Sequence, residues 1–126
     1  MARILIIDDF APILDVFGLM LTAAGHQVTT SGNGPAGLRL AERVPPDLVL
    51  LDVDLPGPNG LAMCFALKSS PTLAAVPVLM MTGRPYWGLN QSITAAGACG
   101  LLIKPIARDS LLDAIKSALE VSRLPR

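Results

Sequence analysis

The sequence is poor in aromatic residues, cysteine and histidine. Its 126 residues include one Trp, one Tyr, three Phe, two Cys and one His. Cys64 and Cys99 lack the paired spacing of a thiolate metal site, so we expect both to be reduced and buried. His26 follows a glycine that ends a helix, which is typical of a surface turn residue. The composition therefore excludes a metal site built from thiolates or from several imidazoles.

Charge of one sign and long apolar stretches are also missing. The ten basic and ten acidic residues give a net charge of zero, and no two basic residues are adjacent, which is unlike a nucleic-acid-binding surface. Every apolar run is much shorter than the roughly 20 residues that span a membrane. The first residues, Met1 to Arg3, lead directly into an apolar run rather than a signal peptide. We expect a cytoplasmic protein, with no direct nucleic-acid binding and no membrane insertion.

Short apolar runs that end at polar residues are the main feature that the sequence does contain. Continuous runs of this kind predict strands that are buried on both faces of a parallel sheet. A shorter segment of β-branched residues between the first two runs predicts a strand at the edge of the sheet. The five predicted strands are Ile4–Ile7, Val28–Thr30, Leu48–Leu51, Val78–Met81 and Leu101–Ile103.

Helical segments follow each of these strands. Five strand–helix units with right-handed crossovers predict an α/β fold of the doubly wound, flavodoxin-like (βα)5 type, with a parallel sheet in the order 2-1-3-4-5 and helices on both faces. The length predicts a single domain over residues 1–126, with its core at about 3–121 and no output domain in this chain. Helices are expected at 12–24, 36–43, 61–68 and 89–96, with a last one around Leu111 to Leu119.

Chemically active side chains follow four of the predicted strands. Asp8 and Asp9 follow the first strand, Asp52 the third, Thr82 the fourth and Lys104 the fifth. In the order 2-1-3-4-5 the first and third strands are neighbours at the switch point, so the three carboxylates should share one crevice. Carboxylates this close need a counter-charge, and an all-oxygen site with open positions suits Mg²⁺. A phosphoryl group on Asp52 would then meet the Lys104 ammonium and the Thr82 hydroxyl.

This pattern resembles the receiver domain of bacterial response regulators over nearly the whole chain. The matching motifs are the acidic pair, the loop Asp52–Gly60 with Pro and Gly four and eight residues after the acid, the Thr82-Gly83 dipeptide, and Lys104-Pro105 preceded by Ala96-Gly97-Ala98. The resemblance implies two-component signalling, with phosphoryl transfer from a histidine kinase or a histidine phosphotransfer protein. Signalling would then proceed through changed contacts with a protein target that the sequence does not identify.

The resemblance also implies the role of each site residue. Asp52 would be the phosphoryl acceptor, and Thr82 and Lys104 would contact the phosphoryl group. Asp8 and Asp9 would hold Mg²⁺ together with the Asp52 carboxylate and the main-chain carbonyl of Asp54. We therefore do not expect an enzyme in the usual sense, but a phosphoacceptor with at most self-phosphorylation from small donors and slow self-dephosphorylation.

Three features near the site are unusual for the family. Receivers usually carry Tyr or Phe three residues before the lysine, and this switch position is Leu101 here. The loop after the fourth strand contains Tyr86 and Trp87, which we interpret either as a partner surface or as packing over the strand ends. Asp54 and Arg84 are expected to pair across the mouth of the site and to set the rate at which the Asp52 phosphate hydrolyses.

The first helix has almost no polar face. Between Phe10 and Gly25 the only charged residue is Asp15, and an apolar surface of this kind usually binds a partner. In the family this helix and the loop after the last strand dock the phosphodonor. We therefore predict a docking face that includes Val16, Met20 and Ile106. A homodimer through the fourth and fifth helices is left open.

Two other functions compete with this interpretation. A pseudo-receiver that is never phosphorylated would serve only as an interaction module, and the missing aromatic residue leaves this open. The segment Asp52-Val53-Asp54 also resembles the nucleophile motif of haloacid-dehalogenase-like phosphohydrolases. Those enzymes carry this motif on their first strand and enclose the substrate with a cap, for which this chain has no segment.

Overall fold

The structure is a computed structural model that describes residues 1–122, and it alternates strand and helix five times. The expected domain limit at residue 126 lies outside the described residues. The strands are β1 (Arg3–Ile7), β2 (Gln27–Ser31), β3 (Leu48–Asp52), β4 (Val78–Thr82) and β5 (Gly100–Ile103). The helices are α1 (Ala11–Ala23), α2 (Gly34–Arg43), α3 (Gly60–Ser69), α4 (Leu89–Ala95) and α5 (Arg108–Ser122).

The sheet confirms the predicted topology. All its strands are parallel and lie in the order β2-β1-β3-β4-β5. The strands β3 and β4 are buried at every residue, as their continuous apolar sequences predict. The register places Ile7 of β1 opposite Leu51 of β3, so both strands reach the same edge of the sheet. The residues that follow them therefore enter the same crevice.

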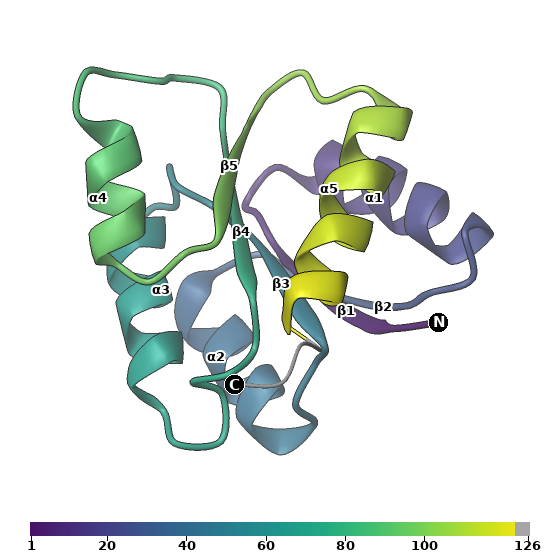
Figure 1. Cartoon of the computed structure of the whole chain (residues 1–126), viewed down its shortest axis with the longest axis horizontal. Coiled ribbons are helices and arrows are strands. Elements are labelled where there is room, and N and C mark those ends of the chain that lie inside the picture. Colours follow the sequence, from purple (N-terminus) through teal and green to yellow (C-terminus); the bar gives the residue numbers. More distant parts are fainter. Residues whose placement is uncertain (123–126) are drawn as a thin grey trace.

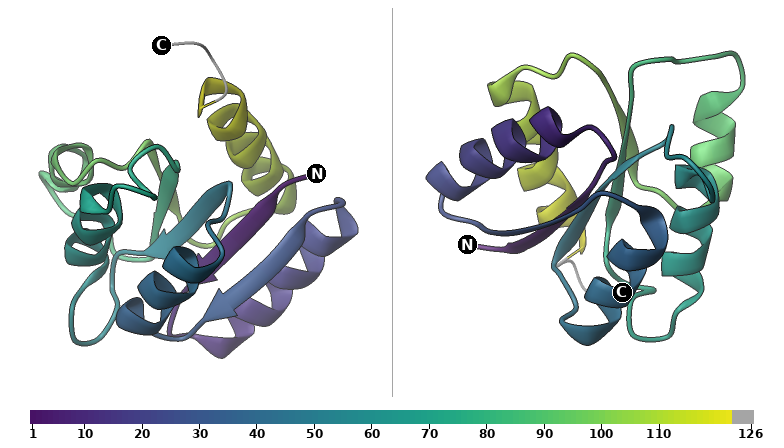
Figure 2. Two further views of the ribbon diagram at one scale, coloured as in Figure 1. Left: turned by 90° about the horizontal axis from the view of Figure 1, so that it is seen from below. Right: turned by 180° about the vertical axis from the view of Figure 1, so that it is seen from behind.

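Helices cover both faces of the sheet. Figure 1 shows α1 and α5 on one face and α2, α3 and α4 on the other, and Figure 2 shows the same layers from below and from behind. Because successive side chains of a strand point to opposite faces, Ile4 and Ile6 pack with α1 and α5, whereas Leu5 and Ile7 pack with the other helices. Among residues 1–122, none of the helices has the length and apolar character that a membrane span requires.

Two of the helices begin earlier than we expected, because an asparagine caps the first turn of each. The side chain of Asn33 accepts a hydrogen bond from the Ala36 amide at 2.8 Å, and that of Asn59 accepts one from the Ala62 amide at 2.9 Å. These caps satisfy amides that have no partner within the helix, so α2 and α3 begin at Gly34 and Gly60.

One expected burial was wrong. Cys64 is buried, and burial raises the pKa of its thiol to about 11, but Cys99 is exposed. Cys99 lies between α4 and β5, where its main-chain amide bonds to the carbonyl of Val78. Connecting segments run over the surface, so the side chain remains at the surface although the backbone is anchored to the sheet.

Candidate functional site

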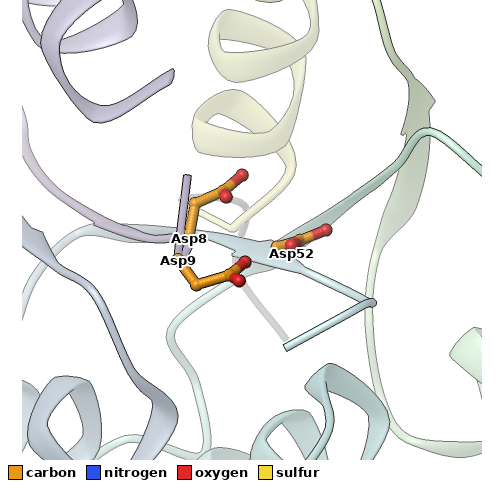
Figure 3. A group of neighbouring side chains, drawn as sticks. All are labelled: Asp8, Asp9 and Asp52. Atoms are coloured by element: carbon orange, nitrogen blue, oxygen red, sulfur yellow. The ribbon is translucent and has the colours of Figure 1, made fainter. Parts of the chain in front are cut away.

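Three carboxylates meet at the carboxyl ends of β1 and β3. Asp8, Asp9 and Asp52 each bring one carboxylate oxygen to a point where these oxygens all lie within 4.8 Å of one another. In Figure 3 the three side chains come from adjacent segments and point into the same space. Asp8 and Asp52 are buried, and Asp9 is exposed to solvent. The switch point of the sheet therefore holds the crevice that the sequence predicted.

Asp8 is anchored through both of its carboxylate oxygens. The main-chain amide of Phe10 donates to its Oδ1 at 2.9 Å, and Lys104 Nζ donates to its Oδ2 at 2.7 Å. The Asp8 amide itself donates to the carbonyl of Ser31, at the end of β2. These bonds hold the carboxylate in one orientation as the chain turns from β1 toward α1.

Lys104 is the counter-charge of the site. Its ammonium lies 2.7 Å from Asp8 Oδ2 and 3.4 Å from Asp52 Oδ1. Burial lowers the pKa of Lys104, but the hydrogen bond to Asp8 and the charges of both carboxylates outweigh it, so the pKa is raised. The side chain therefore carries a positive charge at neutral pH and bridges the two buried acids.

Asp52 is buried beside another acid. The pKa of its carboxyl is raised, mainly by burial and further by the charge of Asp8. A hydrogen bond from the Asp54 amide and the Lys104 ammonium act in the opposite direction but do not outweigh these two effects. One ammonium thus faces three carboxylates. A divalent cation with oxygen ligands fits this donor set, because it supplies the missing positive charge and leaves positions for other oxygens.

Gly60 shapes the site through its backbone, a role that its place in the motif Asp52–Gly60 did not by itself predict. A Cβ at this position would overlap the main-chain carbonyl oxygen of Asp52 and would lie 2.6 Å from Val53 Cα. The Gly60 amide also donates to the Val53 carbonyl at 2.9 Å. Only glycine lets α3 begin this close to the loop after β3, so Gly60 positions the backbone of Asp52.

Thr82 is fully buried at the end of β4, and its hydroxyl has two partners. It donates to Asp54 Oδ2 at 2.8 Å and accepts a hydrogen bond from the Arg84 amide at 3.0 Å. The expected ion pair between Asp54 and Arg84 is absent from the described part of the chain, where the ion pairs are those of Lys104. Both side chains are exposed, and an exposed ion pair gains little over hydration, so the buried hydroxyl is the better partner for Asp54.

The carboxylates and the lysine line an open cleft of about 570 Å³. Arg84 lies on its wall, although it forms no ion pair with Asp54. The lining residues are Asp8, Asp9, Phe10, Ile13, Asp52, Asp54, Gly83, Arg84, Lys104 and Pro105.

The other predicted residues lie around this cleft. Leu101 is half-buried against the core that contacts α3 and α4. Tyr86 and Trp87 have exposed fractions of 52% and 97%, which excludes the packing alternative for Trp87. On the α1 side, Val16 is 46% exposed, whereas Met20 and Ile106 are half-buried and pack against the core that contains residues of α1 and α5.

Sequence comparison supports the same class of protein. The family model described as "Response regulator receiver domain" matches residues 4–116. Protein PilH of Pseudomonas aeruginosa is 36% identical over 124 residues, which cover 94% of this chain and 98% of PilH. Response regulator PleD of Caulobacter vibrioides is 36% identical over 116 residues, which cover 92% of this chain but only 26% of PleD. The chain thus spans about a quarter of PleD and nearly all of PilH.

Solved structures share the fold over almost the whole chain. The chemotaxis protein CheY4 of Vibrio cholerae matches with a TM-score of 0.90 at 29% identity, covering 94% of this chain and 98% of CheY4. A CheY-like receiver domain protein of Methanospirillum hungatei matches with a TM-score of 0.91 at 28% identity, covering 97% of this chain and 96% of the other.

The fold and the acidic site together define a doubly wound signalling domain of the CheY-like class. The chain belongs to the response regulator receiver domain family, whose members take a phosphoryl group on an aspartate within two-component systems. This assignment does not favour the phosphohydrolase alternative. The acidic cluster is able to hold a metal ion, and the family's usual partners are histidine kinases and effector domains.

Proposed function

We propose that Asp52 is the phosphoryl acceptor of this receiver. The observation that carries the proposal is the buried Asp52 carboxylate, which shares Lys104 with Asp8 and lies in an open cleft. An Asp52 oxygen would attack the phosphorus of a phosphohistidine, the nitrogen–phosphorus bond would break, and an acyl phosphate would form while the imidazole leaves. Lys104 and Thr82 would then bind oxygens of the transferred group.

The metal in this proposal is Mg²⁺. Asp8, Asp9 and Asp52 would hold it with their carboxylates, and Asp54 would add its main-chain carbonyl. Mg²⁺ would neutralise charge that develops on the phosphoryl oxygens. The protein residues would bind the ion, orient the acceptor oxygen and exclude other ligands from it. The all-oxygen donor set supports this choice over metals that prefer thiolates or imidazoles.

We further propose that α1 receives the phosphodonor, a histidine kinase or a histidine phosphotransfer protein. Val16 is exposed, and Met20 and Ile106 are half-buried, which supports an apolar docking face. Because the donor's histidine must reach Asp52, a surface adjoining the cleft is suitable. The two free thiols suit the reducing cytoplasm, which we propose as the compartment.

The output of the domain would be a changed protein contact. Tyr86 and Trp87 are exposed on the loop that directly follows Thr82, so a movement of Thr82 would reach them through the three residues 83–85. Leu101 would repack without the ring movement of an aromatic residue. We propose that this loop presents the signal to the protein target.

Asp54 and Arg84 would modulate the lifetime of the phosphoryl group. The Asp54 carboxylate at the cleft could accept a proton from an attacking water, and Arg84 could bind a phosphoryl oxygen. If neither Asp54→Asn nor Arg84→Ala changed the dephosphorylation rate, this part of the proposal would be wrong.

Trp87 fluorescence tests the proposed function directly. Mg²⁺ is added first and acetyl phosphate or beryllofluoride second, with Asp52→Asn as the control, and intact mass is measured in parallel. We expect a stepwise fluorescence change and the added mass of one phosphoryl group, with the mass gain lost in Asp52→Asn. Wild-type protein that gains no phosphoryl mass would instead support the pseudo-receiver alternative.

A further inference from the structure

The single hydrogen of the Thr82 hydroxyl already has an acceptor in this structure. The hydroxyl lies in a fully buried residue, donates its one hydrogen to Asp54 Oδ2 at 2.8 Å, and accepts a hydrogen bond from the Arg84 amide at 3.0 Å. The acceptor is a carboxylate, and hydrogen bonds to ionised acceptors are about twice as strong as neutral ones. The hydroxyl is thus held by Asp54 rather than directed toward Asp52.

The proposed function needs the same hydrogen for another acceptor. A phosphoryl oxygen on Asp52 would be bound by the Thr82 hydroxyl, but a hydroxyl can donate only one hydrogen. Donation to Asp54 and donation to the phosphoryl group therefore exclude each other. The bond to Asp54 must break whenever the phosphoryl group recruits Thr82.

We propose that the Asp54 side chain is a positioning residue that retains the Thr82 hydroxyl in its resting position. This inference rests on the proposed function and extends it, because it gives Asp54 a role that acts through Thr82. An interaction made only in the resting state lowers the apparent affinity for any ligand that requires the other state. Removing the carboxylate should therefore strengthen binding of a phosphoryl group or its mimic.

Two other roles of Asp54 must be separated from this one. A base that activates water would alter hydrolysis but not the binding of beryllofluoride, which is not hydrolysed in this way. A simple charge repulsion would weaken beryllofluoride binding whether or not a hydroxyl is present at position 82. Only retention of Thr82 makes the effect of Asp54 depend on that hydroxyl.

The experiment is a double-mutant cycle on the full chain. The affinity for beryllofluoride at saturating Mg²⁺ is measured by Trp87 fluorescence for wild type, Asp54→Ala, Asp54→Asn, Thr82→Val and the double variant Asp54→Ala/Thr82→Val. Valine has the shape of threonine without the hydroxyl. Asp113→Asn removes an exposed acidic charge from α5 and controls for net charge.

We expect Asp54→Ala to bind beryllofluoride about tenfold more tightly than wild type. Asp54→Asn should show about a threefold gain, because an amide oxygen still accepts the hydrogen bond but carries no charge. In the Thr82→Val background the gain from Asp54→Ala should fall to less than about twofold. Asp113→Asn should bind as wild type does.

A second measurement needs no metal or phosphoryl mimic. The methyl signal of Thr82 is recorded by NMR in the apo protein, together with hydrogen exchange of the Arg84 amide that donates to its hydroxyl. We expect Asp54→Ala to shift the methyl signal and to speed exchange of that amide, since the hydroxyl loses the partner that fixes its rotamer. In the Thr82→Val background the Arg84 amide should not respond to Asp54→Ala.

Equal gains in the threonine and valine backgrounds would overturn the proposal, and so would an unchanged Thr82 signal in Asp54→Ala. Failure of the proposed function has a different signature. Wild-type protein would then bind no beryllofluoride and gain no phosphoryl mass, while the apo NMR measurement would still decide whether Asp54 retains Thr82.

Discussion

Individual residues in the cleft are arranged for function at a cost in stability. Asp52 is buried beside Asp8, and its pKa is raised, so the native state binds this proton more tightly than the unfolded chain does. The group therefore favours folding below its ordinary pKa, and this contribution is lost as pH rises through the raised native value. At neutral pH the charged form opposes folding.

Asp52→Asn should therefore stabilise the protein. We expect the free energy of unfolding to rise by about 1 kcal/mol at pH 7 without divalent metal, because the variant removes one buried charge and keeps the Lys104–Asp8 pair. Urea denaturation at pH 7 and pH 4 measures this. The gain should shrink at pH 4, and a larger gain at the lower pH would contradict the argument.

Gly60 gives a second prediction at the scale of a residue. Gly60→Ala should lower the free energy of unfolding by about 3 kcal/mol, because the added Cβ overlaps the backbone of Asp52. Gly32→Ala is a matched control, since nothing lies within 4 Å of its added Cβ. It should change stability by less than about 0.5 kcal/mol in the same denaturation experiment. Equal losses in the two variants would show that contact with Asp52 is not the cause.

Among the elements, α1 is the one whose surface does not match its position. A helix at the surface normally presents a polar face, but α1 exposes Val16 and Leu19 at 46% and 73%. Phe10, the N-cap residue that precedes α1, also lies in the cleft lining. The apolar face of α1 therefore continues from the site onto the surface.

Val16→Glu should block phosphotransfer from a protein donor without affecting the site itself. We expect a histidine kinase that phosphorylates the wild type to act at least about tenfold more slowly, because the charge is buried in the docked complex. Phosphorylation by acetyl phosphate and the thermal midpoint should not change. Val121→Glu is the control on α5, where the valine is 68% exposed. A similar loss in that control would argue against docking on α1.

For the whole molecule, the proposed metal binding would be coupled to folding, because both depend on the charges of the acidic cluster. Mg²⁺ at 100 times its Kd should raise the free energy of unfolding by about 2.7 kcal/mol, since the unfolded chain does not assemble the three carboxylates. Calorimetric scans with and without Mg²⁺ measure this gain. Asp15→Asn, on α1 outside the cluster, should retain it, whereas Asp9→Asn should lose most of it at the same Mg²⁺ concentration. Retention in Asp9→Asn would place the metal elsewhere.

The topology of the molecule was predictable because it follows from local sequence patterns. Continuous apolar runs predicted β3 and β4 nearly to the residue, and right-handed crossovers left 2-1-3-4-5 as the simplest order. The first and third strands had to be neighbours in that order. The grouping of Asp8, Asp9 and Asp52 then followed from their places at strand ends.

Partners of single side chains were not predictable in this way. Asp54 was expected to form an ion pair with Arg84, but its carboxylate accepts a hydrogen bond from the Thr82 hydroxyl. The paths of the loops that follow β3 and β4 decide which of these groups come within 3 Å of each other. The exposure of Cys99 was missed for a similar reason, since hydrophobicity does not reveal which side of a connecting segment faces solvent.

The sequence by itself determined the strand order and the edge of the sheet at which the acids gather, because periodicity and chain order govern both. Only the tertiary structure decided that Lys104 bridges Asp8 and Asp52, that Gly60 lies against the Asp52 backbone, and that Asp54 holds Thr82. The ion pairs of Lys104 and the hydrogen bond of Asp54 join residues far apart in the chain at distances of a few ångströms. They depend on rotamers and loop paths that no local pattern encodes.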